Sequence, residues 1–197
     1  MLVWINGAFG AGKTSVANVL AQRWPEALIF DPEQVGFMLR RVIPETHRTS
    51  DFQDLPLWRQ LTVETAVGLI DQVHRPLIVP MTMVDRAYFE EIIEGLTRAG
   101  VDVRHFALLA CQRTLRRRLW FRWSLPASKR WTLRQVDRCV EALASPAFAV
   151  HVKADDRQVT EIAAEILAAL PSPLPTRASR ATRLRAPSVE DPDITAR

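Results

Sequence analysis

The segment from residue 7 to residue 15 has the residue types and the spacing that hold nucleotide phosphates. It matches G-x-x-x-x-G-K-[ST], the P-loop pattern, and it directly follows the apolar run at residues 2–5. Glycine lets a backbone turn tightly and approach an anion, and the amides of a following helix would point at phosphate oxygens. Lys13 would place its charge on the β- and γ-phosphates, and Thr14 would offer its hydroxyl to Mg²⁺. The alternative is a glycine-rich turn that binds nothing. The expected nucleotide-binding residues are Gly7, Ala8, Phe9, Gly10, Ala11, Gly12, Lys13, Thr14 and Ser15.

A carboxylate follows the second apolar run. Asp31 comes directly after residues 27–30, and ligands of open α/β sheets bind beyond the carboxyl ends of the strands. Asp31 could therefore take a proton from a substrate hydroxyl while that hydroxyl attacks the γ-phosphate. Glu33 could share this work or hold Mg²⁺. Asp31-Pro32-Glu33 is also good helix-start chemistry, so a helix cap is the alternative role for Asp31, and the two roles are compatible.

The third apolar run lacks the acid with which many P-loop enzymes hold Mg²⁺. It ends in Val79-Pro80-Met81-Thr82, and Asp85 follows three residues later, where it would suit a helix cap. Thr82 could offer its hydroxyl to the site. The metal is therefore expected on Thr14, phosphates and water, with help from Asp31 or Glu33.

An arginine-rich segment covers about residues 113–134. Residues 111–134 contain no Asp or Glu, and tryptophans are interleaved with the arginines. Arg118 and Arg122 are four residues apart and would share a helix face. A basic lid that closes over a nucleotide needs this composition, because arginines neutralise charge on the transferring phosphoryl group. A nucleic-acid-binding surface and a solvated basic helix are the alternatives.

These residues must be positioned by alternating strands and helices. Strands are expected over residues 2–5, 27–30, 76–80, 101–110 and 148–152. Helices are expected over residues 15–21, 35–42, 56–73, 86–99, 111–122, 132–144 and 159–170, with a polar loop over 44–54. This alternation is typical of an α/β fold, in which helices cover the faces of a parallel sheet.

Length and composition indicate one domain. The 197 residues suffice for a single core, which we expect to span residues 1–170. Cys111 and Cys139 form no CxxC, which argues against a zinc site and suits a reducing cytosol. The start lacks a basic signal-peptide region, so a cytoplasmic protein is expected. Residues 171–197 are rich in Pro and Arg and read as a tail outside the core. The tail would contact a partner or the inner membrane surface, or have no role of its own.

Five further blocks of sequence stand out beyond the P-loop pattern. They are Trp4-Ile5-Asn6-Gly7-Ala8-Phe9-Gly10, Asp31-Pro32-Glu33 with Gly36-Phe37 and Leu39-Arg40, Asp51-Phe52-Gln53 with Pro56-Leu57-Trp58-Arg59, Ile78-Val79-Pro80-Met81-Thr82, and Asp137-Arg138-Cys139-Val140-Glu141. With these blocks the chain resembles the tunicamycin-resistance ATP-binding proteins over about residues 1–168. More distantly, it resembles small P-loop kinases, including nucleoside monophosphate kinases, shikimate kinase and chloramphenicol phosphotransferase.

The resemblance implies a three-layer α/β P-loop NTPase fold. A five-stranded parallel sheet would be flanked by helices, with an arginine-rich lid as in nucleoside monophosphate kinases. It also implies ATP as cofactor and resistance to a lipidated uridine-type antibiotic. In the phosphotransferase relatives an Asp after the second strand is the base, and Asp31 matches it. Their lid pattern L-x-x-R-L-x-x-R is matched by Leu115, Arg118, Leu119 and Arg122. The expected catalytic residues are Lys13, Asp31, Arg118 and Arg122.

The acceptor side is expected to include Glu33, Arg40, Trp58, Arg59 and Thr82. The arginines could hold phosphate-like or sugar groups of the drug. Ordinary ion pairs for the arginines and core packing for Trp58 are the alternatives. The leading hypothesis is an ATP-dependent phosphotransferase acting on a hydroxyl of a tunicamycin-like nucleoside antibiotic. The alternatives are ATP-dependent sequestration of the drug without catalysis, and a nucleic-acid-associated P-loop protein.

Overall fold

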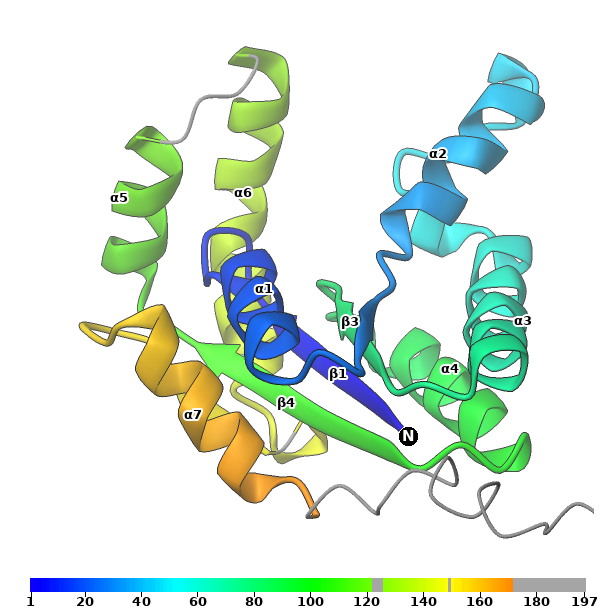
Figure 1. The fold of residues 1–197 in the computed structure, drawn as a ribbon. Coiled ribbons are helices and arrows are strands. Elements are labelled where there is room, and N and C mark those ends of the chain that lie inside the picture. Colours follow the sequence, from blue (N-terminus) through cyan, green and yellow to red (C-terminus); the bar gives the residue numbers. More distant parts are fainter. Residues whose placement is uncertain (122–125, 149, 172–197) are drawn as a thin grey trace, which may run out of the picture.

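Five parallel strands form the sheet at the centre of the fold (Figure 1). The computed structural model describes residues 1–121, 126–148 and 150–171, with residues 126–130 described by their backbone only. The strands lie in the order β2-β3-β1-β4-β5. Their bounds are β1 (Leu2–Gly7), β2 (Leu28–Ile29), β3 (Leu77–Pro80), β4 (Val103–Leu109) and β5 (His151–Lys153).

Helices cover both faces of this sheet, which confirms the predicted three-layer α/β fold (Figure 1). One face is covered by α1 (Lys13–Arg23) and α7 (Val159–Ala169), and the other by α3 (Pro56–Val73), α4 (Arg86–Arg98) and α6 (Pro126–Leu143). The helices α2 (Glu33–Val42) and α5 (Gln112–Phe121) stand on opposite sides of the carboxyl edge of the sheet. In the described part of the chain, no helix is both long and apolar enough to cross a membrane.

The strands β1 and β3 are buried along their whole length. All residues of β1 and β3 are buried, and Leu2 pairs with Leu77 on one side and with Val103 on the other. A parallel sheet with helices on both faces leaves no strand face in water, which is why residues 2–5 and 77–79 read as continuous apolar runs. The edge strand β2 is different, because Ile29 is 41% exposed.

Several predicted elements have different bounds in the structure, and three of them have a visible cause or consequence. The second strand is only Leu28–Ile29, and the fifth begins at His151 because Pro146–Phe148 form a 3₁₀ turn, η3. The helix predicted over residues 132–144 begins at Pro126. Proline suits the first turn of a helix, where its missing N–H costs nothing, so Pro126 was a usable start signal. The tail from residue 172 onward lies outside the described residues, so its prediction stays untested.

The polar loop between α2 and α3 folds back over α2. It contains two 3₁₀ turns, η1 (Glu45–His47) and η2 (Phe52–Asp54). The η2 turn places the Phe52 ring directly against Gly36 of α2, where an added Cβ would lie only 2.6 Å from two ring atoms. Gly36 is therefore needed for a close approach between the helix and the returning loop.

Gly36→Ala should destabilise the protein although alanine is the better helix former. Its methyl group must displace the Phe52 ring, and such overpacking lowers the free energy of unfolding by about 1–3 kcal/mol. Gly68→Ala on α3 is the matched control, because a Cβ there would meet nothing within 4 Å. It should raise the free energy of unfolding by about 0.5–1 kcal/mol. Urea unfolding would check the opposite signs, and stabilisation by both substitutions would contradict the packing described.

Candidate active site

The P-loop connects β1 to α1 at the carboxyl edge of the sheet. Gly10 and Gly12 have φ angles of 84° and 101°, a region that L side chains rarely adopt. The amide of Ala11 donates to the carbonyl of Ala8 at 3.0 Å and tightens the turn. Among the described residues, no side chain caps the N-terminus of α1. Its first amides therefore remain directed at the space before the helix, which is the arrangement that binds phosphate.

A cavity of about 410 Å³ and another of about 490 Å³ flank the loop, and residues of the P-loop and the start of α1 line the second. A Cβ at Gly12 would meet no atom within 4 Å, so the backbone is open to an anion there. Thr14 and Ser15 are exposed at the start of α1, where Thr14 would hold Mg²⁺ beside the phosphates. The larger cavity is lined by residues 10–16 together with Arg118, Leu119, Arg157, Val159 and Ile162.

Lys13 begins α1 and lies next to the rest of its loop. Its Nζ donates to the carbonyl of Ala8 at 3.2 Å and lies 5.6 Å from the centroid of the Phe9 ring. The ammonium group is thus held at the junction of the two cavities, since Phe9 lines the smaller one. This position suits contact with the phosphates nearest the acceptor.

The lid arginine Arg118 lies beside the P-loop. Its Nη2 donates to the carbonyl of Ala154 at 3.0 Å, and its Nη1 lies 3.4 Å from the carbonyl oxygens of Gly10 and Ala11. Arg118 therefore joins α5, the P-loop and the loop after β5 around the nucleotide cavity. Arg122, the other lid arginine predicted to be catalytic, lies outside the described residues.

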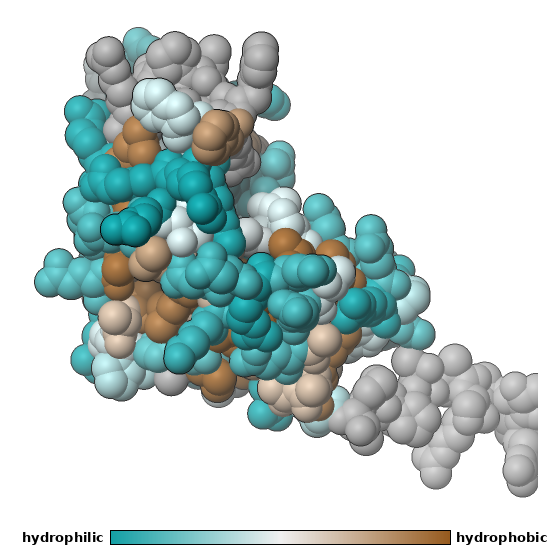
Figure 2. Space-filling model, turned by 90° about the vertical axis from the view of Figure 1, so that its left-hand side faces the viewer, coloured by the Kyte–Doolittle hydropathy of each residue, from teal (hydrophilic) through white to brown (hydrophobic). Residues whose placement is uncertain are grey.

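The segment predicted to form a lid, about residues 113–134, covers most of α5 and the start of α6, and these two helices lie against each other (Figure 1). Arg113, Arg116 and Arg117 are exposed on α5, and Arg116 pairs with Asp137 of α6 at 2.9 Å. Figure 2, which looks onto the side of the molecule with α5 and α7, shows a largely hydrophilic surface. Asp137 is the first acidic residue after residues 111–134, which contain none, and it compensates the charge of Arg116.

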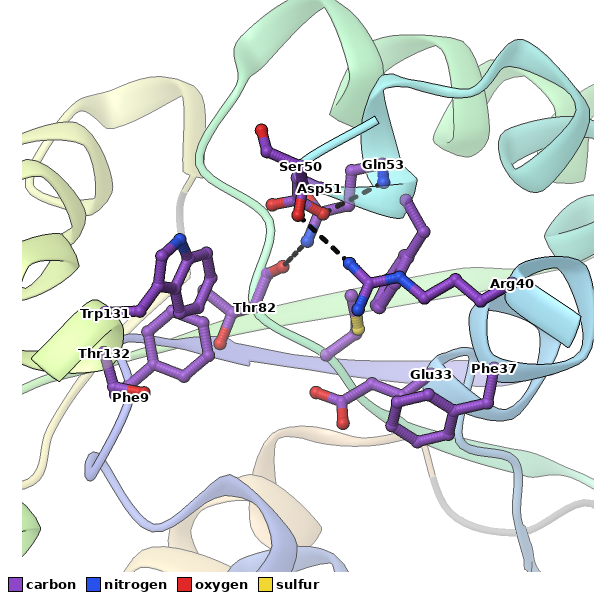
Figure 3. A pocket seen from close by; sticks show the side chains of 12 residues that line it. Phe9, Glu33, Phe37, Arg40, Ser50, Asp51, Gln53, Thr82, Trp131 and Thr132 are labelled. Atoms are coloured by element: carbon purple, nitrogen blue, oxygen red, sulfur yellow. Dashed lines mark hydrogen bonds between the residues drawn. The ribbon is translucent and has the colours of Figure 1, made fainter. Parts of the chain in front are cut away.

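The 410 Å³ cavity has two aromatic walls (Figure 3). Phe9 and Trp131 meet edge to face with centroids 5.4 Å apart on one side, and Phe37 and Phe52 meet at 6.4 Å on the other. Figure 3 shows Glu33 beside Phe37 and Thr82 between the walls. The cavity is lined by Phe9, Glu33, Phe37, Arg40, Ser50, Asp51, Phe52, Gln53, Met81, Thr82, Trp131 and Thr132.

Three of the predicted acceptor residues thus line this cavity. Glu33 and Arg40 come from α2, and Thr82 from the segment after β3. Arg40 is held in place, because its Nη2 donates to the carbonyl of Ser50 at 3.0 Å and its guanidinium carbon lies 5.4 Å from the centroid of the Phe52 ring. Asp31 lies after β2 and directly before Pro32, the N-cap of α2, and its Oδ1 accepts the amide of Glu33 at 3.0 Å. This contact resembles the capping role that was its alternative, and Asp31 is not among the residues that line either cavity.

The other two predicted acceptor residues lie behind the cavity wall. Trp58 is completely buried, donates its Nε1–H to the carbonyl of Pro32 at 3.0 Å and packs on Phe52. Arg59 is 8% exposed, pairs with Glu91 at 2.5 Å and donates to the carbonyl of Gln53 at 2.6 Å. The structure therefore gives both residues the supporting roles that were the alternatives, core packing and an ion pair.

Sequence reasoning missed several cavity residues, among them Phe37, Trp131 and the loop residues Asp51 and Gln53. The available signal was Asp51-Phe52-Gln53, which was noted only as part of a resemblance. Burial raises the pKa of Asp51 above its ordinary value of 3.8, and the nearby Asp54 carboxylate adds to the rise. The amide of Gln53, which donates to Asp51 Oδ1 at 3.0 Å, opposes it. Asp51 thus carries a charge that the folded protein solvates poorly.

Comparisons with known proteins agree with this geometry. A family model described as an AAA domain matches residues 2–124. The structure is similar to the Deinococcus radiodurans tunicamycin resistance protein, with a TM-score of 0.71 and 28% identity over 85% of this chain and 93% of that chain. It shares its fold with a gluconokinase from Sinorhizobium meliloti 1021 (TM-score 0.59, 19% identity, 84% and 89% covered). The same holds for the APS kinase of Mycobacterium tuberculosis (TM-score 0.53, 18% identity, 85% and 95% covered). A search of curated proteins found no match.

Asp51→Asn should stabilise the protein at neutral pH. Because the pKa of Asp51 is raised in the folded state, its carboxyl group binds a proton more tightly there than in the unfolded state. The free energy of unfolding therefore falls as the pH rises from about 3.8 through the folded-state pKa. Asparagine removes that loss and still accepts the Gln53 amide. The gain in melting temperature should be present at pH 7 and should vanish below about pH 3.8. Thermal unfolding at both pH values would measure it, with the exposed substitution Asp71→Asn on α3 as the baseline. A gain that is equal at both pH values would contradict this account.

Proposed function

This chain belongs to the AAA domain family, and from that membership we propose that it is an ATP-dependent phosphotransferase acting on a hydroxyl of a small molecule. One observation carries the proposal. Phe9 of the P-loop lines the aromatic cavity, while the ammonium of Lys13 lies 5.6 Å from the centroid of the same ring. The P-loop and the aromatic cavity therefore meet at one residue, as transfer between two bound molecules would require.

In this proposal the P-loop, the acceptor cavity and Asp31, which precedes α2 and is not among the residues lining either cavity, have complementary roles. The P-loop amides and Lys13 would hold the ATP phosphates, and Thr14 would hold Mg²⁺, which neutralises charge on the phosphates. The acceptor oxygen forms a bond to the γ-phosphorus as the bond from that phosphorus to the β–γ bridging oxygen breaks, leaving ADP. Asp31 would take the proton of the hydroxyl, and Glu33, which lines the acceptor cavity, would orient that hydroxyl. Arg118, and Arg122 on closure, would stabilise the transferring group.

We further propose a tunicamycin-like nucleoside as the acceptor. Two findings support this choice: the similarity to a tunicamycin resistance protein, and the pairs of aromatic rings on two sides of the cavity. Aromatic walls of this kind stack on or edge against a planar ring such as a nucleobase. Gln53 and Asp51, between the walls, offer hydrogen-bonding groups to its polar atoms.

Sequestration of the drug without transfer is the second candidate function. It is favoured by the hydrogen bond that occupies Asp31 Oδ1, since this bond shows a structural use for the proposed base. Both functions need the same nucleotide and acceptor sites, so binding measurements do not separate them.

Mass spectrometry of tunicamycin incubated with the protein and Mg·ATP separates them directly. Transfer adds one phosphoryl group to the drug, whereas sequestration leaves its mass unchanged. Lys13→Ala is the control, because nothing near it in sequence replaces its charge on the phosphates. We expect phosphorylated drug with the wild type and nearly none with Lys13→Ala. Unchanged drug after many equivalents of enzyme and Mg·ATP would refute phosphotransfer to tunicamycin.

Asp31→Asn should show whether Asp31 acts as a general base or only caps α2. Asparagine keeps the shape and accepts the Glu33 amide equally well, so a residue that only caps α2 can be replaced almost without loss. If Asp31 is the base, turnover should fall by roughly 10²–10⁴ while Mg·ATP and the drug bind as before. Recovery at high Mg²⁺ would instead indicate a metal ligand. Glu33→Gln is the matched variant, and an active Asp31→Asn enzyme would leave Glu33 as the remaining candidate.

A further inference from the structure

Both polar backbone groups of Gly7 are held by buried side chains. The amide of Gly7 donates to Asn6 Oδ1 at 2.8 Å, and its carbonyl accepts the hydroxyl of Thr82 at 2.9 Å. Asn6 is completely buried and Thr82 is 4% exposed. Because Gly7 is the first residue of the P-loop, these two bonds fix the direction in which the loop leaves β1.

The opposite side of Gly7 is closed by β4 and by the P-loop itself. A Cβ at Gly7 would lie 3.1 Å from Leu108 Cβ and 3.2 Å from Ala11 Cβ. Asn6 also joins β1 to the segment after β3, since its Nδ2 donates to the carbonyl of Met83 and its Oδ1 accepts the amide of Met83. The start of the P-loop is therefore clamped between β4 and residues 82–83.

The same segment forms part of the acceptor cavity. Met81 and Thr82 line that cavity, and the carbonyl of Thr82 accepts the side-chain amide of Gln53 at 3.0 Å (Figure 3). Gln53 also lines the cavity, and its backbone amide is held by Asp51. A continuous series of hydrogen bonds thus connects the acceptor loop, through Thr82, to the first residue of the P-loop.

We propose that Thr82 is a positioning residue that couples the acceptor cavity to the P-loop: its hydroxyl holds the Gly7 carbonyl, and its own carbonyl is held by Gln53. The inference rests on the proposed function only in taking the aromatic cavity as the acceptor site. It gives the Thr82 hydroxyl a role beside the expected contact with substrate, because its proton is donated to Gly7 while its lone pairs can still accept. Phosphate binding needs amides that are oriented before the ligand arrives. Loosening Gly7 should therefore weaken nucleotide binding without unfolding the chain.

Thr82→Val tests this proposal, because it keeps the shape of the side chain and removes only the hydroxyl. We expect the Kd for Mg·AMPPNP, measured by titration calorimetry, to rise by about 10-fold, the effect of one lost buried hydrogen bond. Thr82→Ser restores the hydroxyl and should bind within about twofold of the wild type. Thr62→Val is the matched control, since Thr62 is buried on α3 and its hydroxyl has no hydrogen-bond partner in the described chain. A Kd for Thr82→Val equal to that of the wild type would overturn the proposal.

Gln53→Met covers the case in which Thr82→Val fails to fold. Gln53 is only partly buried, so this variant should fold while it releases the Thr82 carbonyl. Its Kd for Mg·AMPPNP should rise by about threefold, which is the effect on affinity of losing one partly exposed hydrogen bond. Gln53 is not among the residues that line the cavity at the P-loop, so a direct contact with the nucleotide would not explain this rise. An unchanged Kd would overturn the coupling. If the wild type transfers no phosphate to tunicamycin but this pattern of affinities holds, the proposed reaction fails and the role of Thr82 stands.

Discussion

The burial of β1 between β3 and β4 is the constraint on which the rest of the structure depends. Every residue of β1 is buried, and its neighbours β3 and β4 are hydrogen-bonded to it on both sides. Its end therefore cannot shift relative to the segments that follow those two strands. The P-loop continues from β1, the acceptor wall at Thr82 continues from β3, and the lid begins after β4. The two cavities lie next to each other because the segments that line them begin at adjacent strand ends.

Local sequence patterns were sufficient for the parts of the site that are continuous in the chain. The P-loop is one such part, because the preceding strand, the glycines and the start of α1 follow one another without interruption. The alternation of strands and helices was predicted from local patterns as well. So was the capping role of Asp85, whose side chain accepts the Tyr88 amide at 3.1 Å. In each case the determining interactions join residues close in sequence, and the amino-acid types alone reveal them.

The acceptor cavity could not be predicted in the same way. Phe9 and Trp131 are more than a hundred residues apart, and only the packing of α6 beside the P-loop brings their rings together. For Trp58 the necessary information was in the sequence. Trp58, Thr62 and Ala66 recur every four residues on α3 and form its buried face. That periodicity favoured core packing over contact with substrate, and Arg59 follows Trp58 into the same interior, where Glu91 compensates its charge.

The double role of Phe9 limits how such a site can evolve. A new acceptor needs a cavity of different shape, and α2 contributes side chains such as Phe37, on the wall opposite Phe9, that can be exchanged without touching the P-loop. Phe9 cannot be exchanged so freely, because its ring also lies under the ammonium of Lys13. Selection for a new acceptor would therefore alter the wall far from the P-loop first, and relatives with different acceptors should differ most in α2.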